Sequence, residues 1–346
     1  MVCWCKIASK FWWHSSGRRG GCEIIASVHR TRVILMTSFA EDVCLPALVQ
    51  AQNEDGGWGY RAAFASRVEP TCWALLGMAG HVDWERAGKA LERGYQWLRS
   101  SQLPDGSWPA VAGQQEGSWT TALACLALRR LETATAEMDK GLAWICQEWP
   151  REGGWWWRIL RWLRREENVS RQNDSYRGWN WTSRTSSWVE PTAYALIALD
   201  STPASQRLKL AVRRRQLGEA MLYDRMCPGG GWNAGNPTVY GVPGDPNVVP
   251  TVWALLALRH NRSRPENQQS VDWLEQHGIR TNGPGSLALA HLCLEVYGRS
   301  ASPLEAALQE FYRRNQFLLN VQVLAWAALA LSPRPGWLHT AEEVVK

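Results

Sequence analysis

Two glutamates are the residues of this sequence best placed to transfer a proton. Glu69 stands four positions before Trp73, and Glu190 stands four positions before Tyr194. Residues four apart share one face of an α-helix, so each carboxyl is expected one turn from an aromatic ring. A buried acid that stays protonated can attack an alkene, and aromatic faces can shelter the carbocation that forms. The pattern indicates acid-initiated chemistry on an unsaturated hydrocarbon, with Glu190 and Glu69 as candidate catalytic residues.

The same glutamates also have a structural explanation. Both open a Glu-Pro-Thr triplet, at Glu69 and at Glu190, and proline is favoured in the first turn of a helix. A glutamate at that place can cap free backbone N–H groups. The helix dipole would also stabilise its anion and lower its pKa, which opposes a role as an acid. Catalysis and capping are therefore both open.

Further aromatic and basic residues occupy corresponding places around the helix starts. We expect substrate contacts from five aromatic residues, Trp73, Trp119, Trp188, Tyr194 and Trp253. The adjoining loops supply Arg61, Arg67, Arg158, Arg177 and Arg184. Arginines beside convergent helix N-termini suit an anion such as a diphosphate, so Arg177 and Arg184 are also predicted to bind substrate. Solvated surface arginines are the alternative.

A basic, tryptophan-rich segment at 155–165 is a candidate for membrane contact. As a helix it places apolar and basic side chains on different sides, as interfacial helices do. The predicted membrane residues are Trp156, Arg161, Trp162 and Leu163. The alternative is a lid that packs on the protein, and both interpretations suit a lipid substrate.

Internal repeats supply the elements that must position these residues. A turn ending in Gly-Trp or Ser-Trp recurs at Gln52–Trp58, Gln102–Trp108, Gln147–Trp155 and Gly230–Trp232. An apolar helix is expected after each turn, and two degenerate copies follow at 285–296 and 320–331. The glutamine and indole can satisfy and cover a helix end, so these tryptophans are expected to be structural.

Amphipathic helices are expected before the apolar ones. They lie near 41–52, 85–102, 137–147, 206–226, 267–277 and 304–315. A helix that is apolar all round belongs inside, and one with a polar face belongs outside. The sequence therefore predicts an all-α protein, a single (α/α)6 toroid of six helical hairpins, without a competing strand pattern.

The repeats resemble those of squalene–hopene cyclases, oxidosqualene cyclases and protein prenyltransferase β-subunits, over 48–331. The resemblance implies a toroid of the terpenoid cyclase and prenyltransferase superfamily that handles isoprenoids. Bacterial triterpene cyclases open an inner helix with Asp-x-Asp-Asp-Thr-Ala, whose middle aspartate donates the proton. The matching stretch is 188–193, where Glu190 takes that place and Trp188 and Pro191 replace the flanking aspartates.

The sequence also departs from these families. Prenyltransferases hold zinc with Asp-x-Cys at an inner-helix start and a later histidine, whereas Glu69–Cys72 reads Glu-Pro-Thr-Cys. We therefore predict neither a metal nor a cofactor. Triterpene cyclases carry two toroids and this chain has room for one, as in a prenyltransferase β-subunit.

Composition limits the remaining possibilities. The chain has 346 residues, 45% of them hydrophobic, with 23 tryptophans and a net charge of +6. This charge does not predict nucleic acid, but it fits an acidic lipid or a phosphorylated ligand. The nine cysteines lack close pairing after Cys5, which favours a reducing compartment. We predict a cytoplasmic protein, peripheral to the membrane, and leave the oligomeric state open.

The first 35 residues differ from the rest. Met1–Leu35 lacks helical or strand periodicity, and Met36 stands directly before the first repeat. We predict residues 1–35 to be a disordered leader or to lie upstream of the true start, and residues 36–346 to be the toroid domain.

The predicted function is isoprenoid handling, most simply by a terpene cyclase-like enzyme with an aromatic-lined central cavity. One alternative is a non-catalytic toroid that binds a lipid or a protein. Others are a prenyl-diphosphate-binding, prenyltransferase-like protein and a carbohydrate-active α/α barrel.

Overall fold

The structure is a computed structural model. It describes residues 38–81, 85–111, 113–131, 135–151, 159, 163, 172–200, 209–281, 283–332 and 338. Residues 37–346 form one compact unit, and the fold is given for the described part of it. Among these residues no helix combines the length and the apolar character needed to span a bilayer.

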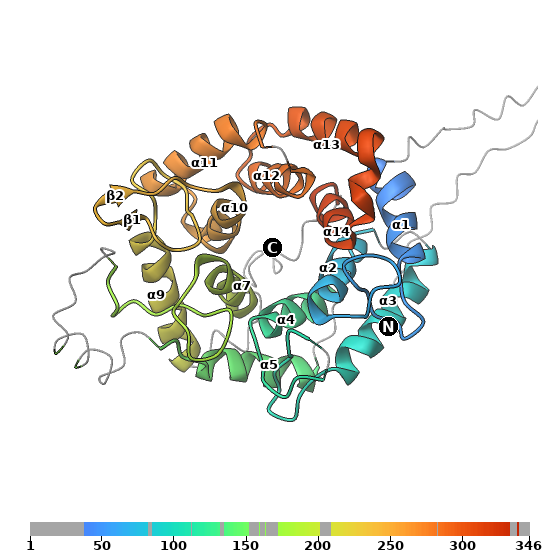
Figure 1. Ribbon diagram of the computed structural model, residues 1–346, viewed down its shortest axis with the longest axis horizontal. Helices are drawn as coiled ribbons and strands as arrows, with labels where there is room; N and C mark the ends of the chain where they lie inside the picture. Colours follow the sequence, from blue (N-terminus) through green and yellow to red (C-terminus); the bar gives the residue numbers. More distant parts are fainter. Residues whose placement is uncertain are drawn as a thin grey trace, which may run out of the picture. The chain divides into compact units, whose positions relative to one another are not determined.

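Six helices form an inner ring within this unit (Figure 1). They are α2 (Val68–Met78), α4 (Thr120–Arg130), α7 (Val189–Asp200), α10 (Val248–Ala257), α12 (Pro284–Val296) and α14 (Val321–Ala330). Each packs against the next in this order, and α14 packs against α2, which closes the ring. At this last contact a Cβ on Gly77 would lie 2.6 Å from the carbonyl oxygen of Ala325, so only glycine allows the two helices to approach so closely.

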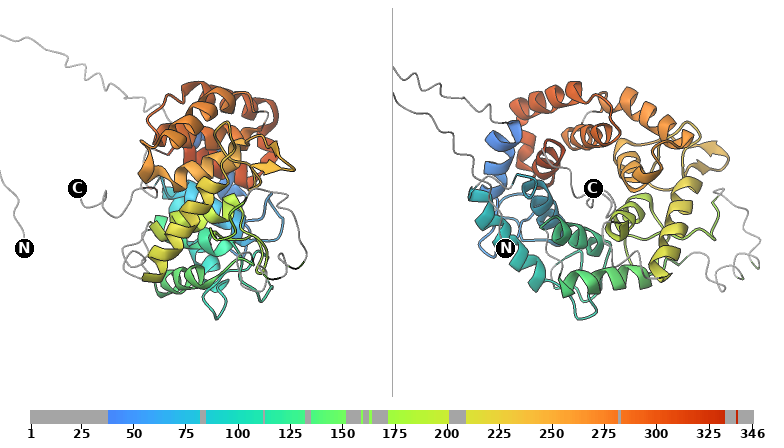
Figure 2. Two further views of the ribbon diagram at one scale, coloured as in Figure 1. Left: turned by 90° about the vertical axis from the view of Figure 1, so that its left-hand side faces the viewer. Right: turned by 180° about the vertical axis from the view of Figure 1, so that it is seen from behind.

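Six further helices surround the inner ring, as Figure 2 shows from the opposite side. They are α1 (Leu45–Gln50), α3 (Glu85–Ser100), α5 (Ala136–Gln147), α9 (Lys209–Asp224), α11 (Pro265–Gly278) and α13 (Ser302–Asn315). A π-helical turn, η1 (Ala40–Cys44), leads into α1. Each outer helix presents a partly apolar face to the inner ring and a polar face to solvent, so the predicted alternation of outer and inner helices is confirmed.

Short elements occupy the connections. Two 3₁₀ turns, η2 (Arg259–Asn261) and η3 (Gln316–Leu319), follow α10 and α13. A β-hairpin with strands of two residues each, β1 (Thr238–Val239) and β2 (Val242–Pro243), precedes α10. The sequence did not predict this hairpin, because two residues are too few for a strand period to be visible.

A repeated hydrogen-bond unit fixes each turn between an outer and an inner helix. In the first repeat, the indole Nε1 of Trp58 donates to Leu48 O at 2.8 Å, and its backbone N–H donates to Thr71 Oγ1 at 2.9 Å. Trp108 makes the same two bonds with Leu98 and Thr121. Trp232 makes them with Leu222 and Thr251. These tryptophans are fully buried, as a structural role requires.

In the third repeat the prediction that Trp155 is the structural tryptophan of the turn is wrong. Trp179 holds that position, because its indole donates to Ile145 O at 2.8 Å and its N–H to Thr192 Oγ1 at 2.9 Å. Trp155 lies outside the described residues. The extra residues of this repeat therefore lie between α5 and Trp179.

Arg214 of α9 completes the third repeat. The first two repeats use glutamine, with Gln102 Nε2 donating to Gly106 O and Glu137 O at 2.8 Å each. Arg214 instead donates to Glu148 O, Arg177 O and Gly178 O at 2.9–3.1 Å. Its guanidinium lies 4.1 Å from the ring centroid of Trp149 and 3.9 Å from that of Trp179. One buried arginine thus caps the helix end and joins two tryptophans.

Candidate active site

Three aromatic rings from different inner helices meet at the centre of the ring. Trp73 of α2, Tyr194 of α7 and Trp253 of α10 have centroids 5.9, 5.2 and 5.0 Å apart in pairs. Their exposed fractions are 0%, 3% and 0%. We call these three side chains the aromatic cluster. Because α2 does not neighbour α7 or α10, the cluster joins opposite sides of the inner ring.

Further aromatic side chains extend the cluster. Trp119, directly before α4, stacks on Tyr194 at 5.7 Å and meets Trp181 edge-on at 4.7 Å. Trp326 of α14 meets Trp73 edge-on at 5.7 Å. Trp119, Trp181 and Trp326 are half-buried, so the aromatic surface continues from the cluster toward solvent.

The two glutamates lie one helical turn above the cluster, at the N-terminal ends of α2 and α7. Glu69 and Glu190 are half-buried, and all remaining residues of α2 and α7 are buried. Proline follows each glutamate and starts the helix without an unsatisfied N–H group. The geometry therefore brings together the two predicted carboxyls and the rings of Trp73 and Tyr194.

Glu69 accepts hydrogen bonds from one loop residue and from one residue of α14. Tyr60 Oη donates to Glu69 Oε2, and Gln322 Nε2 donates to Glu69 Oε1 at 3.0 Å. Burial raises the pKa of Glu69, while these donors and the nearby Arg67 oppose the shift. The buried Trp73 Nε1 makes no hydrogen bond of normal geometry among the described residues, yet it lies near enough to favour the Glu69 carboxylate.

Glu190 has the opposite environment. Its carboxyl forms no hydrogen bond with any residue the structure describes, so it caps no backbone N–H group there. Burial, and secondly the charge of Glu69, raise the pKa of Glu190 to about 7. Burial of the Tyr194 side chain, together with the charges of Glu190 and Glu69, raises the pKa of Tyr194. An acid that is half protonated near neutral pH thus stands over the aromatic cluster.

The remaining predicted site residues lie in different places. Trp188 is half-buried directly before α7, and its N–H donates to Trp179 O at 2.9 Å. The guanidinium of Arg177 lies 5.6 Å from the Trp149 centroid, beside Arg214. Arg184 is exposed at a loop position with φ of +65°. Arg177 and Arg184 thus both belong to the connection between α5 and α7.

The predicted membrane segment lies mostly outside the described residues, including Trp156, Arg161 and Trp162. Two of its apolar side chains are described, Ile159 at 38% and Leu163 at 62% exposure. Both side chains are therefore exposed to solvent.

Several residues of this site were not predicted. Tyr60, Trp181, Gln322 and Trp326 reach it from loops or from the last inner helix. Gln322 and Trp326 lie within the degenerate sixth repeat. The second residue of α14 matches Glu69 of α2 in position, and that correspondence could have identified Gln322. No group of three or more potential metal ligands occurs among the described residues.

The chain was compared with known proteins in sequence and in structure. No protein-family model matches the chain. Lanosterol synthase from Homo sapiens is 38% identical over 74 residues, which are 18% of this chain and 10% of that protein. Drimenyl diphosphate synthase from Streptomyces showdoensis is 28% identical over 260 residues, 64% of this chain and 46% of that protein. The type II terpene cyclase MstE from Scytonema matches in structure with a TM-score of 0.57 at 13% identity, over 86% of this chain and 98% of that one.

The protein is an α/α toroid with the fold of the type II terpene cyclase MstE. The predicted fold and the resemblance to the terpenoid cyclase and prenyltransferase superfamily are confirmed. The toroid matches less than half the length of either curated relative. Its fold also occurs in an α-amylase from Clostridium perfringens, with a TM-score of 0.53 at 10% identity over 84% of this chain and 96% of that one. The fold alone therefore does not select the reaction.

Proposed function

We propose that the toroid cyclises an isoprenoid by protonation, with Glu190 as the general acid. The observation that carries the proposal is the half-buried Glu190 carboxyl one turn above the aromatic cluster, which lacks hydrogen bonds among the described residues and whose pKa is raised to about 7. Such an acid is protonated in part at neutral pH and is not held as an anion. Glu69, whose carboxyl accepts bonds from Tyr60 and Gln322, raises the pKa of Glu190 through its charge.

The reaction needs no redox cofactor. The Glu190 proton adds to one carbon of a C=C bond, and the π electrons form the new C–H bond. The next alkene donates its π electrons to the resulting cation and closes a C–C bond. The final cation loses a proton to solvent, and Glu190 regains one, so the product is an isomer of the substrate. The π faces of Trp73, Tyr194, Trp253 and Trp119 stabilise the cations.

Two relatives support an isoprenoid substrate. One is named for drimenyl diphosphate and the other for lanosterol, and both names describe cyclic isoprenoids. The half-buried aromatic surface of Trp119, Trp181 and Trp326 suits such a chain better than a sugar, which needs paired hydrogen-bonding groups. The prediction that Arg177 and Arg184 bind a diphosphate stays part of this proposal.

The experiment compares product formation by wild type and Glu190→Gln. Each purified protein is incubated with farnesyl or geranylgeranyl diphosphate, and dephosphorylated extracts are analysed by gas chromatography and mass spectrometry. We expect a cyclic isomer from wild type and at least about a hundredfold less from Glu190→Gln. Glu92→Gln, an exposed change on α3, should leave turnover unchanged. Equal turnover by Glu190→Gln and wild type would contradict the proposal.

A non-catalytic lipid-binding toroid is the second candidate. It is favoured by the mutual contact of Trp73, Tyr194 and Trp253, which fills the middle of the inner ring with side chains. On this hypothesis, extraction of the purified protein yields a bound isoprenoid or other lipid, and no substrate is converted.

A further inference from the structure

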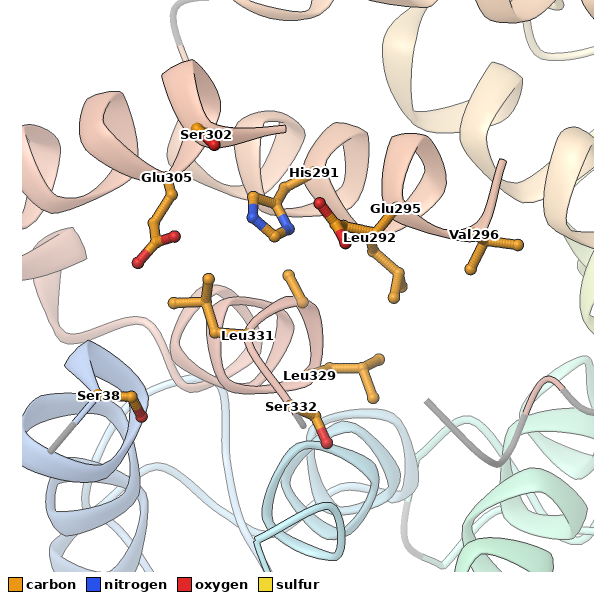
Figure 3. A pocket seen from close by; sticks show the side chains of 11 residues that line it. Ser38, His291, Leu292, Glu295, Val296, Ser302, Glu305, Leu329, Leu331 and Ser332 are labelled. Carbon is orange, nitrogen blue, oxygen red and sulfur yellow. The ribbon is translucent and has the colours of Figure 1, made fainter. Parts of the chain in front are cut away.

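A second polar site lies at the opposite ends of the inner helices. A pocket of about 470 Å³ opens between the C-terminal ends of α12 and α14 and the N-terminal end of α13 (Figure 3). Its polar lining consists of Ser38, His291, Glu295, Ser302, Glu305 and Ser332. Glu69 and Glu190 stand in the first turns of their helices, so this pocket is separate from the candidate active site.

The charge of the pocket is acidic. In Figure 3 the imidazole of His291 lies between the carboxyls of Glu295 and Glu305. Neither glutamate forms an ion pair with a lysine or arginine among the described residues, and Glu305 Oε1 accepts a hydrogen bond from the uncharged Gln309 Nε2 at 3.2 Å. The C-terminal ends of α12 and α14 add partial negative charge. Two guanidiniums reach the rim, Arg130 at Ser332 Oγ (3.4 Å) and Arg262 at Val296 O (3.3 Å).

His291 supplies an independent indication of a ligand. It is only 7% exposed, and its Nδ1 has no hydrogen-bond partner among the described residues. Burial lowers the pKa of His291, against the opposing charges of Glu295 and Glu305 and a hydrogen bond to the backbone of Ala330. Burial thus favours the neutral imidazole, in which Nδ1 can accept a hydrogen bond. A buried acceptor without a donor costs free energy that a ligand N–H group would recover.

We propose that this pocket binds a primary ammonium group carried on a short apolar chain. The ammonium lies between Glu295 and Glu305 and donates one N–H to His291 Nδ1, while Leu329 and Leu331 contact the chain. A quaternary ammonium fits the charge but has no N–H for His291, and a carboxylate or phosphate is repelled. The proposal does not depend on the proposed cyclase activity.

The test uses the full-length protein and n-octylammonium chloride in isothermal titration calorimetry. We expect one site per chain and at least about a tenfold loss of affinity in Glu295→Gln/Glu305→Gln. The matched control is Glu275→Gln/Glu310→Gln, which removes two surface carboxyls from α11 and α13 that pair with arginines outside the pocket. It has the same net charge as the test variant and should bind like wild type.

Three results would overturn the proposal. The first is no binding at about 10 mM probe, far above the range of a specific site. The second is an equal loss in the test and control variants, or a loss in Glu190→Gln instead, which would place the probe elsewhere. The third is equal affinity for n-octyltrimethylammonium, which would remove the role of His291. Circular dichroism of each variant confirms that it is folded.

Discussion

Two glutamates in equivalent helix positions acquire different properties from their neighbours. Glu69 accepts hydrogen bonds from Tyr60 and Gln322, which favour its anion. Glu190 has no such donors among the described residues and faces the charge of Glu69. A pair of carboxyls whose pKa values are pushed apart is the arrangement from which one residue can act as an acid.

The raised pKa of Glu190 predicts a pH-dependent effect on stability. Its folded-state pKa of about 7 exceeds the ordinary value of 4.5, so ionisation costs more in the folded than in the unfolded protein. The contribution of Glu190 to the free energy of unfolding therefore falls as pH rises from about 4.5 to about 7 and is constant above. We expect Glu190→Gln to be more stable than wild type by about 1–3 kcal/mol at pH 8, and by less at pH 5.

Urea unfolding at both pH values measures this difference, with Glu92→Gln on the exposed face of α3 as the control. A helix cap would give the opposite sign, because losing it should cost about 0.5–2 kcal/mol. A destabilised Glu190→Gln variant at pH 8 would therefore support capping and exclude the buried-acid interpretation.

The two carboxyls could be predicted from the sequence, but their environment could not. A spacing of four residues fixes which side chains share a helix face, so Glu69 with Trp73 and Glu190 with Tyr194 followed directly. Gln322 is 253 positions from Glu69, and no local pattern relates them. Only the closure of the ring brings this donor to the carboxyl and so distinguishes Glu69 from Glu190.

At the scale of elements, the same tryptophan-containing turn connects outer and inner helices in several repeats, and in the third repeat Arg214 replaces the glutamine. The first, second and fourth repeats follow the sequence pattern. The third repeat contains an insertion with its own Gly-Gly-Trp, and this local match led to the prediction of Trp155. The hydrogen bonds of Trp179 identify the correct residue. Sequence similarity alone could not separate two tryptophans in one long connection.

Arg214 should contribute most to the stability of the turn in the third repeat. Arg214→Lys removes the planar group that bonds three carbonyls and stacks between Trp149 and Trp179. We expect a loss of about 2–4 kcal/mol in the free energy of unfolding, since a lysine cannot satisfy the same geometry. Chemical denaturation provides the measurement. Arg213→Lys, the exposed neighbour on α9, should change it by less than about 0.5 kcal/mol.

The segment around Leu163 should contact membranes. Replacing Trp156, Trp162 and Leu163 by serine is expected to abolish co-sedimentation with vesicles that contain phosphatidylserine, because the apolar side chains provide the burial. High salt should weaken wild-type binding, since the arginine contribution is screened. Ile279→Ser, at an exposed apolar residue after α11, is the control. Unchanged sedimentation of the triple variant would favour a lid.

At the scale of the molecule, the order of outer and inner helices was predictable because burial follows helical periodicity. The long apolar helices have no polar face to present to solvent, so the ring is the arrangement that buries all of them. The contacts across the ring were not predictable. Trp73 meets Tyr194 and Trp253 from helices that are not its neighbours, which depends on the diameter of the closed ring.

Residues 1–35 should be dispensable for folding. Deleting Met1–Leu35 is expected to leave the midpoint of thermal unfolding within about 2 °C of wild type, because all twelve helices of the two rings begin after residue 37. Differential scanning calorimetry of both proteins measures the midpoint. A larger decrease would mean that this segment packs on the rings.

The contact of α14 with α2 also determines when the protein can fold during synthesis. Helix α2 leaves the ribosome early, but the helix that covers its Gly77 face is encoded by residues 321–330. Until those residues emerge, the nascent chain carries an open apolar edge, on which chaperones and other unfinished chains can bind. A chain truncated before α14 is therefore expected to keep this apolar edge exposed and to be degraded faster than the full-length protein.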